Sequence, residues 1–181
     1  MTPTIRTERL LLEPYDHGDE ETFVVLVGDE AVNRYVGDGA LSEQDARSLF
    51  LRVFPVYEEN RFDVWAVRED GRHIGHAEIK PSKTIEGHEL VYVLAESAWG
   101  RGLGTELAAA IVAYGFGTLG LDRVYATVHE DNAASLHTLG KIGFVHDRDV
   151  SNEDGHVTRV LVAHRDRAGE GTLPPRDQHH G

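Results

Sequence analysis

The chain has 181 residues, enough for one domain with a sizeable core, and its 40% hydrophobic and 27% charged content excludes a wholly disordered protein. A formal net charge of −13 argues against a nucleic-acid surface, which needs clustered lysine and arginine, and favours a basic or amine-bearing partner. Cysteine does not occur, which excludes disulfide scaffolds, zinc–cysteine sites and thiol nucleophiles.

The first residues lack the basic-then-apolar pattern of a signal peptide. The longest uncharged apolar run, residues 107–116, is too short to span a bilayer. We therefore expect a soluble, cytoplasmic protein without a membrane partner.

The first half of the chain alternates strand-like and helix-like segments. Pro14 closes a first strand, Gly28 ends a helix that begins with acidic residues, and Ser42 with Asp45 approximates a capping box that starts a second helix. A turn ending at Gly71 has the composition of a hairpin. The predicted elements are a strand over residues 9–13, a helix over 19–27, a helix from 42, and strands over 62–68 and 72–79.

The second half predicts the organising unit of the fold. Its elements are a strand over 90–94 that is apolar on both faces, a glycine-rich turn, a helix over 105–119, a strand over 124–128, a helix over 132–142 and a closing hairpin over 144–149 and 156–163. Two strands joined by one helix are normally parallel, so this half predicts a βαβ unit within a mixed sheet. We expect a single domain over residues 1–166 and a disordered tail over 167–181, which has little apolar content.

The sequence WGRGLGT, residues 99–105, indicates a phosphate-binding turn that opens a helix. Backbone N–H groups at a helix start have no intrahelical partners, and the helix dipole adds partial positive charge there. Glycines at 100, 102 and 104 let the backbone approach a ligand closely. The plainer interpretation is a loop that merely needs glycine conformations.

Two familiar nucleotide motifs do not fit this turn. A dinucleotide-binding fingerprint requires GxGxxG early in a doubly wound unit, whereas the spacing here is GxGxG late in the chain. A nucleotide-hydrolase loop needs a Gly-Lys-Ser/Thr ending, which is missing.

The chain resembles the GNAT superfamily of acyl-CoA-dependent N-acetyltransferases, nearest to the RimJ/RimL-like branch that acetylates ribosomal-protein N-termini. The superfamily motif Gln/Arg-x-x-Gly-x-Gly/Ala matches residues 99–104, with Trp99 in first place as in the branch's own Trp-Gly-x-Gly variant. A second motif, Asn-x-x-Ser followed by Lys-x-Gly-Phe, matches Asn132, Ser135 and residues 141–144. The opening TERLLLEP and the later stretch VNRYVGDGALSEQDA are similar to the same branch, so the likeness covers about residues 7–165.

The resemblance implies an α/β fold with a central mixed, mostly antiparallel sheet of about seven strands, splayed between the fourth and fifth, with helices on both faces. It implies an N-acetyltransferase that moves acetyl from acetyl-CoA to a primary amine by direct attack in a ternary complex. The acceptor is an amine-bearing small molecule, a peptide or a protein N-terminus. A non-catalytic acyl-CoA-binding or regulatory domain is the alternative, and a homodimer is left open.

Carried over residue by residue, the resemblance places the cofactor along two segments. Backbone groups of Val91, Tyr92 and Val93 are expected to pair with the pantetheine arm. The turn formed by Trp99, Gly100, Arg101, Gly102, Leu103, Gly104 and Thr105 is expected to bind the pyrophosphate. Asn132 is a good helix cap, and a cofactor contact is its sharper interpretation.

Two residues are catalytic candidates. Glu89 begins the cofactor strand, where several superfamily members place a base, although it fits a solvent-facing carboxylate equally well. Ser135 is expected near the leaving sulfur, as a proton donor or as a plain hydrogen-bonding group. The tyrosine that many members place seven residues after the asparagine is replaced by Leu139, so no tyrosine acid carries over.

The eleven histidines do not predict a metal site. His73 and His76 should lie on opposite faces of one strand, and His88 and His129 belong to separate elements. We expect acceptor specificity to lie in residues 27–60 and in the closing hairpin. Four aromatic residues are candidates for the acceptor pocket, Tyr35, Phe54, Tyr57 and Trp65, although aromatic residues at such spacings more often form core.

Overall fold

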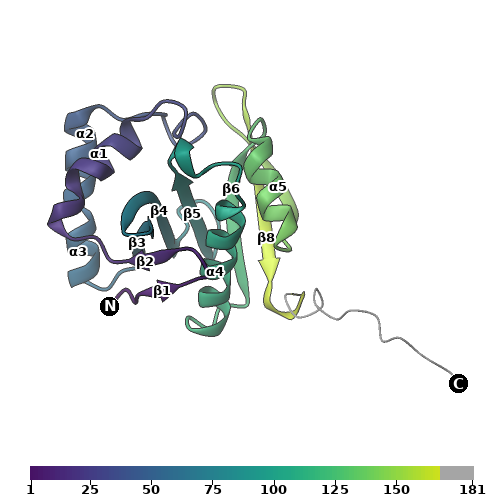
Figure 1. The fold of residues 1–181 in the computed structure, drawn as a ribbon. Helices are drawn as coiled ribbons and strands as arrows, with labels where there is room; N and C mark the ends of the chain where they lie inside the picture. The colour runs from purple at the N-terminus through teal and green to yellow at the C-terminus, as the bar shows by residue number, and fades with distance from the viewer. Residues whose placement is uncertain (168–181) are drawn as a thin grey trace, which may run out of the picture.

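The computed structural model describes residues 1–167, which form one mixed sheet with helices on both faces (Figure 1). The predicted tail lies outside the described residues except for Arg167, which ends a short 3-10 turn. The described strands are β1 Ile5–Arg6, β2 Leu11–Glu13, β3 Asp63–Glu69, β4 Arg72–Pro81, β5 His88–Leu94, β6 Arg123–His129, β7 Val145–Ser151 and β8 Val157–His164. The helices are α1 Glu20–Gly28, α2 Glu43–Leu51, α3 Val53–Glu58, α4 Leu103–Gly117 and α5 Ala133–Lys141.

The sheet confirms the predicted fold class, with eight strands in the order β1-β2-β3-β4-β5-β6-β8-β7 in the described part. The strand beyond the expected seven is β1, which pairs antiparallel with β2. All neighbours are antiparallel except β5 and β6. These two parallel strands are joined by a single register pair among the described residues, Glu89 with Tyr125, so they diverge towards their carboxyl ends.

Two hydrophobic cores cover the two faces of the sheet. Helix α4 packs against one face, where Trp65, Ile79 and Leu90 are buried beside Leu107 and Ile111. Helices α1 to α3 cover the other face with a second cluster that includes Tyr15, Phe23 and Phe50. The burial of Trp65 shows that this aromatic residue belongs to the core and does not line an acceptor pocket.

Helix α2 begins where the capping box predicted. The Ser42 hydroxyl accepts a hydrogen bond from the Asp45 backbone N–H at 3.1 Å. The helical pattern that continues to Phe54 is divided at Arg52, between α2 and α3. Pro55 explains the division, because a continuous helix would need the backbone N–H that proline lacks.

The predicted hairpin between β3 and β4 is present, and one expectation within it is wrong. Asp70 and Gly71 adopt positive φ values of 49° and 78°, which suit a tight hairpin turn. A register shift follows, opposite Val67 and Arg68. This bulge breaks the strict alternation of faces, so His73 and His76 both reach the Tyr15 hydroxyl, at 3.3 Å and 2.9 Å.

No helix in the described part of the chain is long and apolar enough to cross a bilayer.

Candidate active site

The glycine-rich turn lies between β5 and α4. Gly100 and Gly102 adopt left-handed conformations with φ of 71° and 76°, which few other residues tolerate. Helix α4 begins at Leu103, two residues earlier than predicted, with Gly102 as its N-cap. Within the described residues, none of the backbone N–H groups of residues 100–105 has an acceptor in hydrogen-bonding geometry. These free donors at a helix start form a cradle that is expected to favour an anion.

The N-terminal segment is hydrogen-bonded to this turn and to the first turn of α4. Arg9 donates from Nη1 to the Arg101 carbonyl at 2.7 Å and from Nε to the Glu106 carboxylate at 2.7 Å. Thr7 also donates to Glu106, at 2.6 Å. Burial opposes ionisation of Glu106, but these hydrogen bonds lower its pKa. Arg9 therefore ties the turn to the first turn of α4.

The side chain of Arg101 is committed elsewhere. Its guanidinium makes a bidentate pair with the Glu69 carboxylate, with both N–O distances 2.8 Å. The hydrogen bonds with Glu69 raise the pKa of Arg101, and they lower the pKa of Glu69. The expected contribution of Arg101 to phosphate binding is thus limited to its backbone, because its charge is already paired.

Strand β5 presents free backbone groups to the gap beside β6. The Ala95 N–H donates to a β4 carbonyl at 2.8 Å, and backbone groups alternate in direction along a strand. Those of Val91 and Val93 therefore also face β4, whereas those of Tyr92 and Leu94 face the gap. Of the three residues expected to pair with pantetheine, only Tyr92 has its backbone groups available there.

A groove of about 670 Å³ joins this gap to the turn. Tyr35 and Val32, from the segment between α1 and α2, form one wall, and Lys141 lies at the end of α5 on the other. The groove is lined by most of the predicted site residues, namely Tyr92, Val93, Trp99, Gly100, Gly102, Leu103, Gly104, Thr105, Asn132 and Ser135. Val91, Arg101 and Glu89 do not line it.

Helix α5 places the second motif against the groove. The Asn132 side chain accepts a hydrogen bond from the Ser135 backbone N–H at 3.2 Å, which caps α5 as expected. Ser135 and Thr138 line the groove together with Tyr92. Burial raises the pKa of Tyr92, and the hydroxyl groups of Ser135 and Thr138 partly offset the rise. The phenol is therefore protonated at neutral pH.

Glu89 lies at the closed end of the gap, where β5 and β6 still pair. Its carboxylate is half-buried and accepts a hydrogen bond from the Ser82 hydroxyl at 3.2 Å. Across the strand pair it is opposite Lys80. This position is neither fully exposed nor in the groove, so the role of Glu89 stays a prediction.

A scan against protein-family models matches residues 9–145 to the acetyltransferase (GNAT) domain. The chain belongs to the GNAT acetyltransferase family. Its sequence is 32% identical over 152 residues to N-acetyltransferase YoaA of Bacillus subtilis (strain 168), described as uncharacterized, covering 80% of this chain and 84% of YoaA.

Solved GNAT structures share the fold. Mycobacterium smegmatis RimJ in complex with CoA-disulfide superposes with a TM-score of 0.77 at 17% identity, covering 88% of this chain and 84% of RimJ. Spermidine N-acetyltransferase from Vibrio cholerae, in complex with CoA and spermine, gives a TM-score of 0.76 at 18% identity, covering 90% and 99%. At these identities the likeness to RimJ extends to the fold and leaves the RimJ/RimL-like branch as an expectation.

The GNAT motifs did not reveal the phenol of Tyr92 as a site group. The family's tyrosine position holds Leu139, which is buried in the core. Tyr92 instead lies on β5 and lines the groove together with Ser135, because alternate side chains of this strand point towards α4 and α5. The alternation of side-chain directions along β5 could have indicated which way the Tyr92 phenol points. Without the position of α5, that direction did not indicate a functional role.

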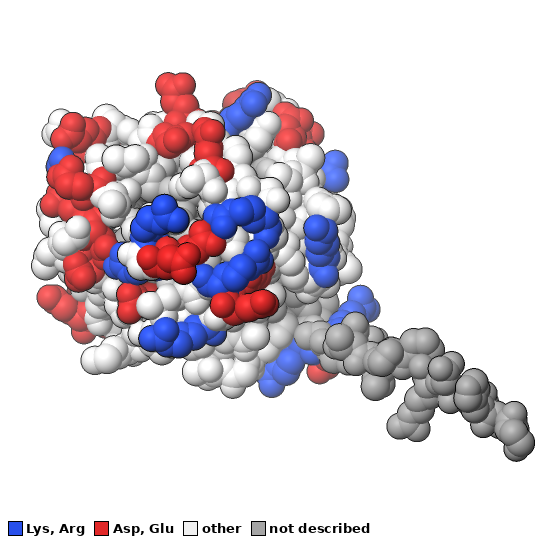
Figure 2. All heavy atoms as spheres, in the orientation of Figure 1, with Lys and Arg blue, Asp and Glu red and all other residues white. Residues whose placement is uncertain are grey.

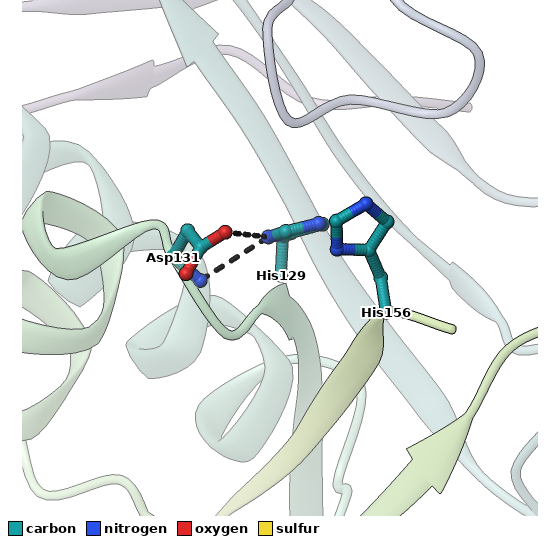
Figure 3. Close-up of side chains that lie close together, drawn as sticks. All are labelled: His129, Asp131 and His156. Atoms are coloured by element: carbon teal, nitrogen blue, oxygen red, sulfur yellow. Dashed lines mark hydrogen bonds and ion pairs between the residues drawn. The ribbon is translucent and has the colours of Figure 1, made fainter. Parts of the chain in front are cut away.

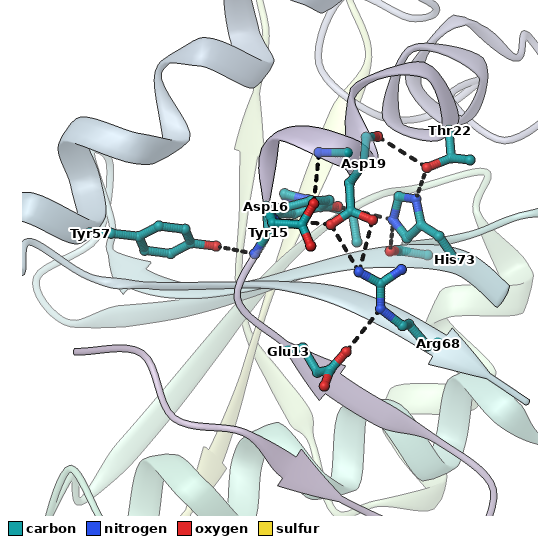
Figure 4. Close-up of polar contacts among 11 residues, drawn as sticks. Glu13, Tyr15, Asp16, Asp19, Thr22, Tyr57, Arg68 and His73 are labelled. Carbon is teal, nitrogen blue, oxygen red and sulfur yellow. Dashed lines mark hydrogen bonds and ion pairs between the residues drawn. The ribbon is translucent and has the colours of Figure 1, made fainter. Parts of the chain in front are cut away.

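A buried polar network lies on the opposite face of the sheet (Figure 4). Tyr15 links His73 and His76, and the His73 ring also contacts the Thr22 hydroxyl at 2.8 Å. His76 Nε2 contacts the Glu78 carboxylate at 2.9 Å. The network joins β4 to α1 through the contact between His73 and Thr22, and none of its residues lines the groove.

Proposed function

We propose that this GNAT enzyme transfers acetyl from acetyl-CoA to a primary amine by direct attack in a ternary complex. One observation carries the proposal: a single groove connects backbone groups of Tyr92, in the gap between β5 and β6, to free N–H groups at the start of α4. Pantetheine carries amides that pair with an exposed strand, and a pyrophosphate fits a helix N-terminus. The groove therefore matches an acyl-CoA along its length.

The proposed placement follows the chain's own donors. The pyrophosphate binds residues 100–105, and the ammonium of Lys141 adds positive charge on the groove wall. The pantetheine arm pairs with Tyr92 and with the Leu94 N–H. The thioester then lies deeper in the gap, between the closed end at Glu89 and the hydroxyl group of Ser135.

In the proposed reaction, a neutral amine attacks the acetyl carbonyl carbon and the carbon–sulfur bond breaks. Glu89, through water, takes the proton that the amine nitrogen loses. Ser135 donates a proton to the departing thiolate and regains one through water from the protonated Glu89, which returns both side chains to their starting forms. The products are the N-acetyl amine and CoA.

The proposed acceptor is a cationic amine on a small molecule, a peptide or a protein N-terminus. Carboxylates gather over α1 and α2 at the upper left of Figure 2, and they include Asp45 as well as Glu20, Glu21 and Glu43, whose charges Arg47 partly offsets. Such a surface attracts ammonium groups before they lose a proton in the site. The structural relatives named above include one called a spermidine N-acetyltransferase, whose acceptor is an amine.

The catalytic assignment is tested with Glu89→Gln. We expect amine-dependent CoA release to fall about 100-fold or more, the usual loss of a general base, with an unchanged Kd for acetyl-CoA. Glu86→Gln, in the exposed loop before β5, is the matched control and should keep full activity. Equal turnover by the two variants would remove Glu89 from the reaction.

The acceptor is identified by incubating the enzyme with acetyl-CoA and a panel of amines, peptides and intact proteins. Mass spectrometry then detects an added acetyl group and locates it. If acetyl-CoA binds but no amine in the panel accelerates CoA release, transfer to amines is not the function of this groove.

A further inference from the structure

Two imidazoles and a carboxylate converge outside the groove (Figure 3). His129 ends β6, Asp131 lies in the turn after it, and His156 comes from the turn between β7 and β8. One ligand atom from each of the three residues lies within 4.8 Å of the other two. The sequence pattern gave no sign that His129 and His156 are neighbours; the closing hairpin brings their rings together, with centroids 4.8 Å apart.

The His129 ring is held in one orientation by contacts with Asp131 and Tyr35. The Asp131 backbone N–H donates to its Nδ1 at 3.1 Å, and an amide can donate only to an unprotonated nitrogen. The unprotonated nitrogen is also the form that a metal binds. The Tyr35 ring packs against the imidazole with centroids 5.1 Å apart, which holds its plane. A metal at Nδ1 exchanges the amide contact for a metal bond, with the Asp131 carboxylate oxygen 3.9 Å away.

Glu130 fixes the second segment beside the first. Its backbone N–H donates to the Val157 carbonyl at 3.0 Å, and its carboxylate accepts from the Val157 N–H at 3.0 Å. The same carboxylate lies 4.0 Å from His156 Nδ1. The end of β6 and the start of β8 are thus hydrogen-bonded to each other without an ion. Metal binding would therefore require little ordering of the chain.

We propose that His129, Asp131 and His156 bind a divalent transition-metal ion such as zinc. Two imidazoles and one carboxylate suit a borderline metal, whereas magnesium and calcium prefer oxygen ligands alone. The net charge of −13 favours cation binding in general. Tyr35 and Asn132 are neighbours of the cluster and also line the groove. A bound ion would therefore hold the turn between β7 and β8 close to the groove.

The test is zinc titration by calorimetry of the full chain, without an affinity tag and after chelator treatment. His179 and His180 lie in the tail outside the described residues, so the titration uses a background in which both are alanine. In that background we expect one zinc site that Mg²⁺ does not occupy. His129→Ala and His156→Ala should each weaken zinc binding by more than the roughly 10- to 100-fold that loss of an outer-shell partner costs.

The matched control is His146→Ala. His146 also pairs with an aspartate, at 2.7 Å from Asp149, but within residues 1–167 no third ligand group joins that pair. Its replacement should leave zinc affinity unchanged. Asp131→Asn, on an exposed side chain, keeps the test valid if His129→Ala fails to fold. Equal zinc affinity in the background, His156→Ala and Asp131→Asn proteins would overturn the proposal.

Discussion

At the scale of single residues, Glu78 is a largely buried carboxyl group whose pKa lies well below its ordinary value. It lies on β4 between His76 and Lys80, and its side chain is 17% exposed. Burial alone would raise its pKa, but the hydrogen bond from His76 and the charge of Lys80 lower it to about 2. Glu78 is therefore ionised at neutral pH in the interior, where its partners compensate for lost hydration.

The pKa of Glu78 predicts a pH-dependent contribution to stability. A pKa of about 2 in place of the ordinary 4.5 corresponds to on the order of 3 kcal/mol, present above pH 4.5 and lost as the pH falls towards 2. Glu78→Gln should therefore lower the free energy of unfolding at pH 7, and the deficit should shrink between about pH 5 and pH 2. Urea unfolding at several pH values measures this difference.

Glu21→Gln is the control for that experiment. Glu21 is also paired with an arginine, Arg47, which lowers its pKa, but its side chain is 77% exposed. Solvent screens such pairs, so no resolvable change in stability is expected. A deficit for Glu78→Gln that stays constant with pH would show that shape, rather than charge, accounts for its role.

At the scale of elements, the start of α4 is the proposed binding site of the pyrophosphate. Its first turn is tied to the N-terminal segment through Glu106 and Arg9, so the cradle is rigid before a ligand arrives. A rigid cradle loses less conformational entropy on binding than a flexible loop.

Gly102→Asp should weaken acetyl-CoA binding at least about tenfold, which is 1.4 kcal/mol. The added carboxylate repels the pyrophosphate, and the left-handed backbone adds strain of about 1 to 2 kcal/mol to the fold. Gly120→Asp is the matched control, because Gly120 has a similar φ of 68° and open space around it at the other end of α4. Calorimetry with acetyl-CoA should separate the two variants, and equal affinities would contradict the phosphate assignment.

At the scale of the whole molecule, the sheet consists of two halves that diverge. Strands β1 to β5 pair continuously, as do β6, β8 and β7, and the two groups share the single β5–β6 register pair (Figure 1). A ligand in the gap would supply the hydrogen bonds that β6 does not. Binding should therefore stabilise β5 specifically, in addition to the turn.

Amide hydrogen exchange should register that stabilisation. We expect acetyl-CoA to slow exchange at Tyr92 and Leu94, whose N–H groups face the gap, and across residues 100–105. Strand β3, which is paired on both sides, should not change. Protection of the turn without protection of β5 would place the pantetheine arm outside the gap.

The sequence predicted the mixed sheet and the two GNAT motifs because these depend on local rules. Ser42 and Asn132 cap helices whatever surrounds them, and Gly102 is needed wherever the backbone turns with positive φ. Arg101 was harder to interpret, since its charge is paired with Glu69, 32 residues away. Contacts over such separations leave no periodic signal in one sequence.

The sequence by itself determined the order of the elements, the family and the position of the glycine-rich turn, because hydrophobic period, caps and glycine spacing act between near neighbours. Only the tertiary structure decided which groups meet. A bulge in β4 brings His73 and His76 to one tyrosine, Tyr92 and Ser135 line one groove, and the closing hairpin sets His156 beside His129. These encounters depend on register and crossover geometry, which a linear pattern does not record.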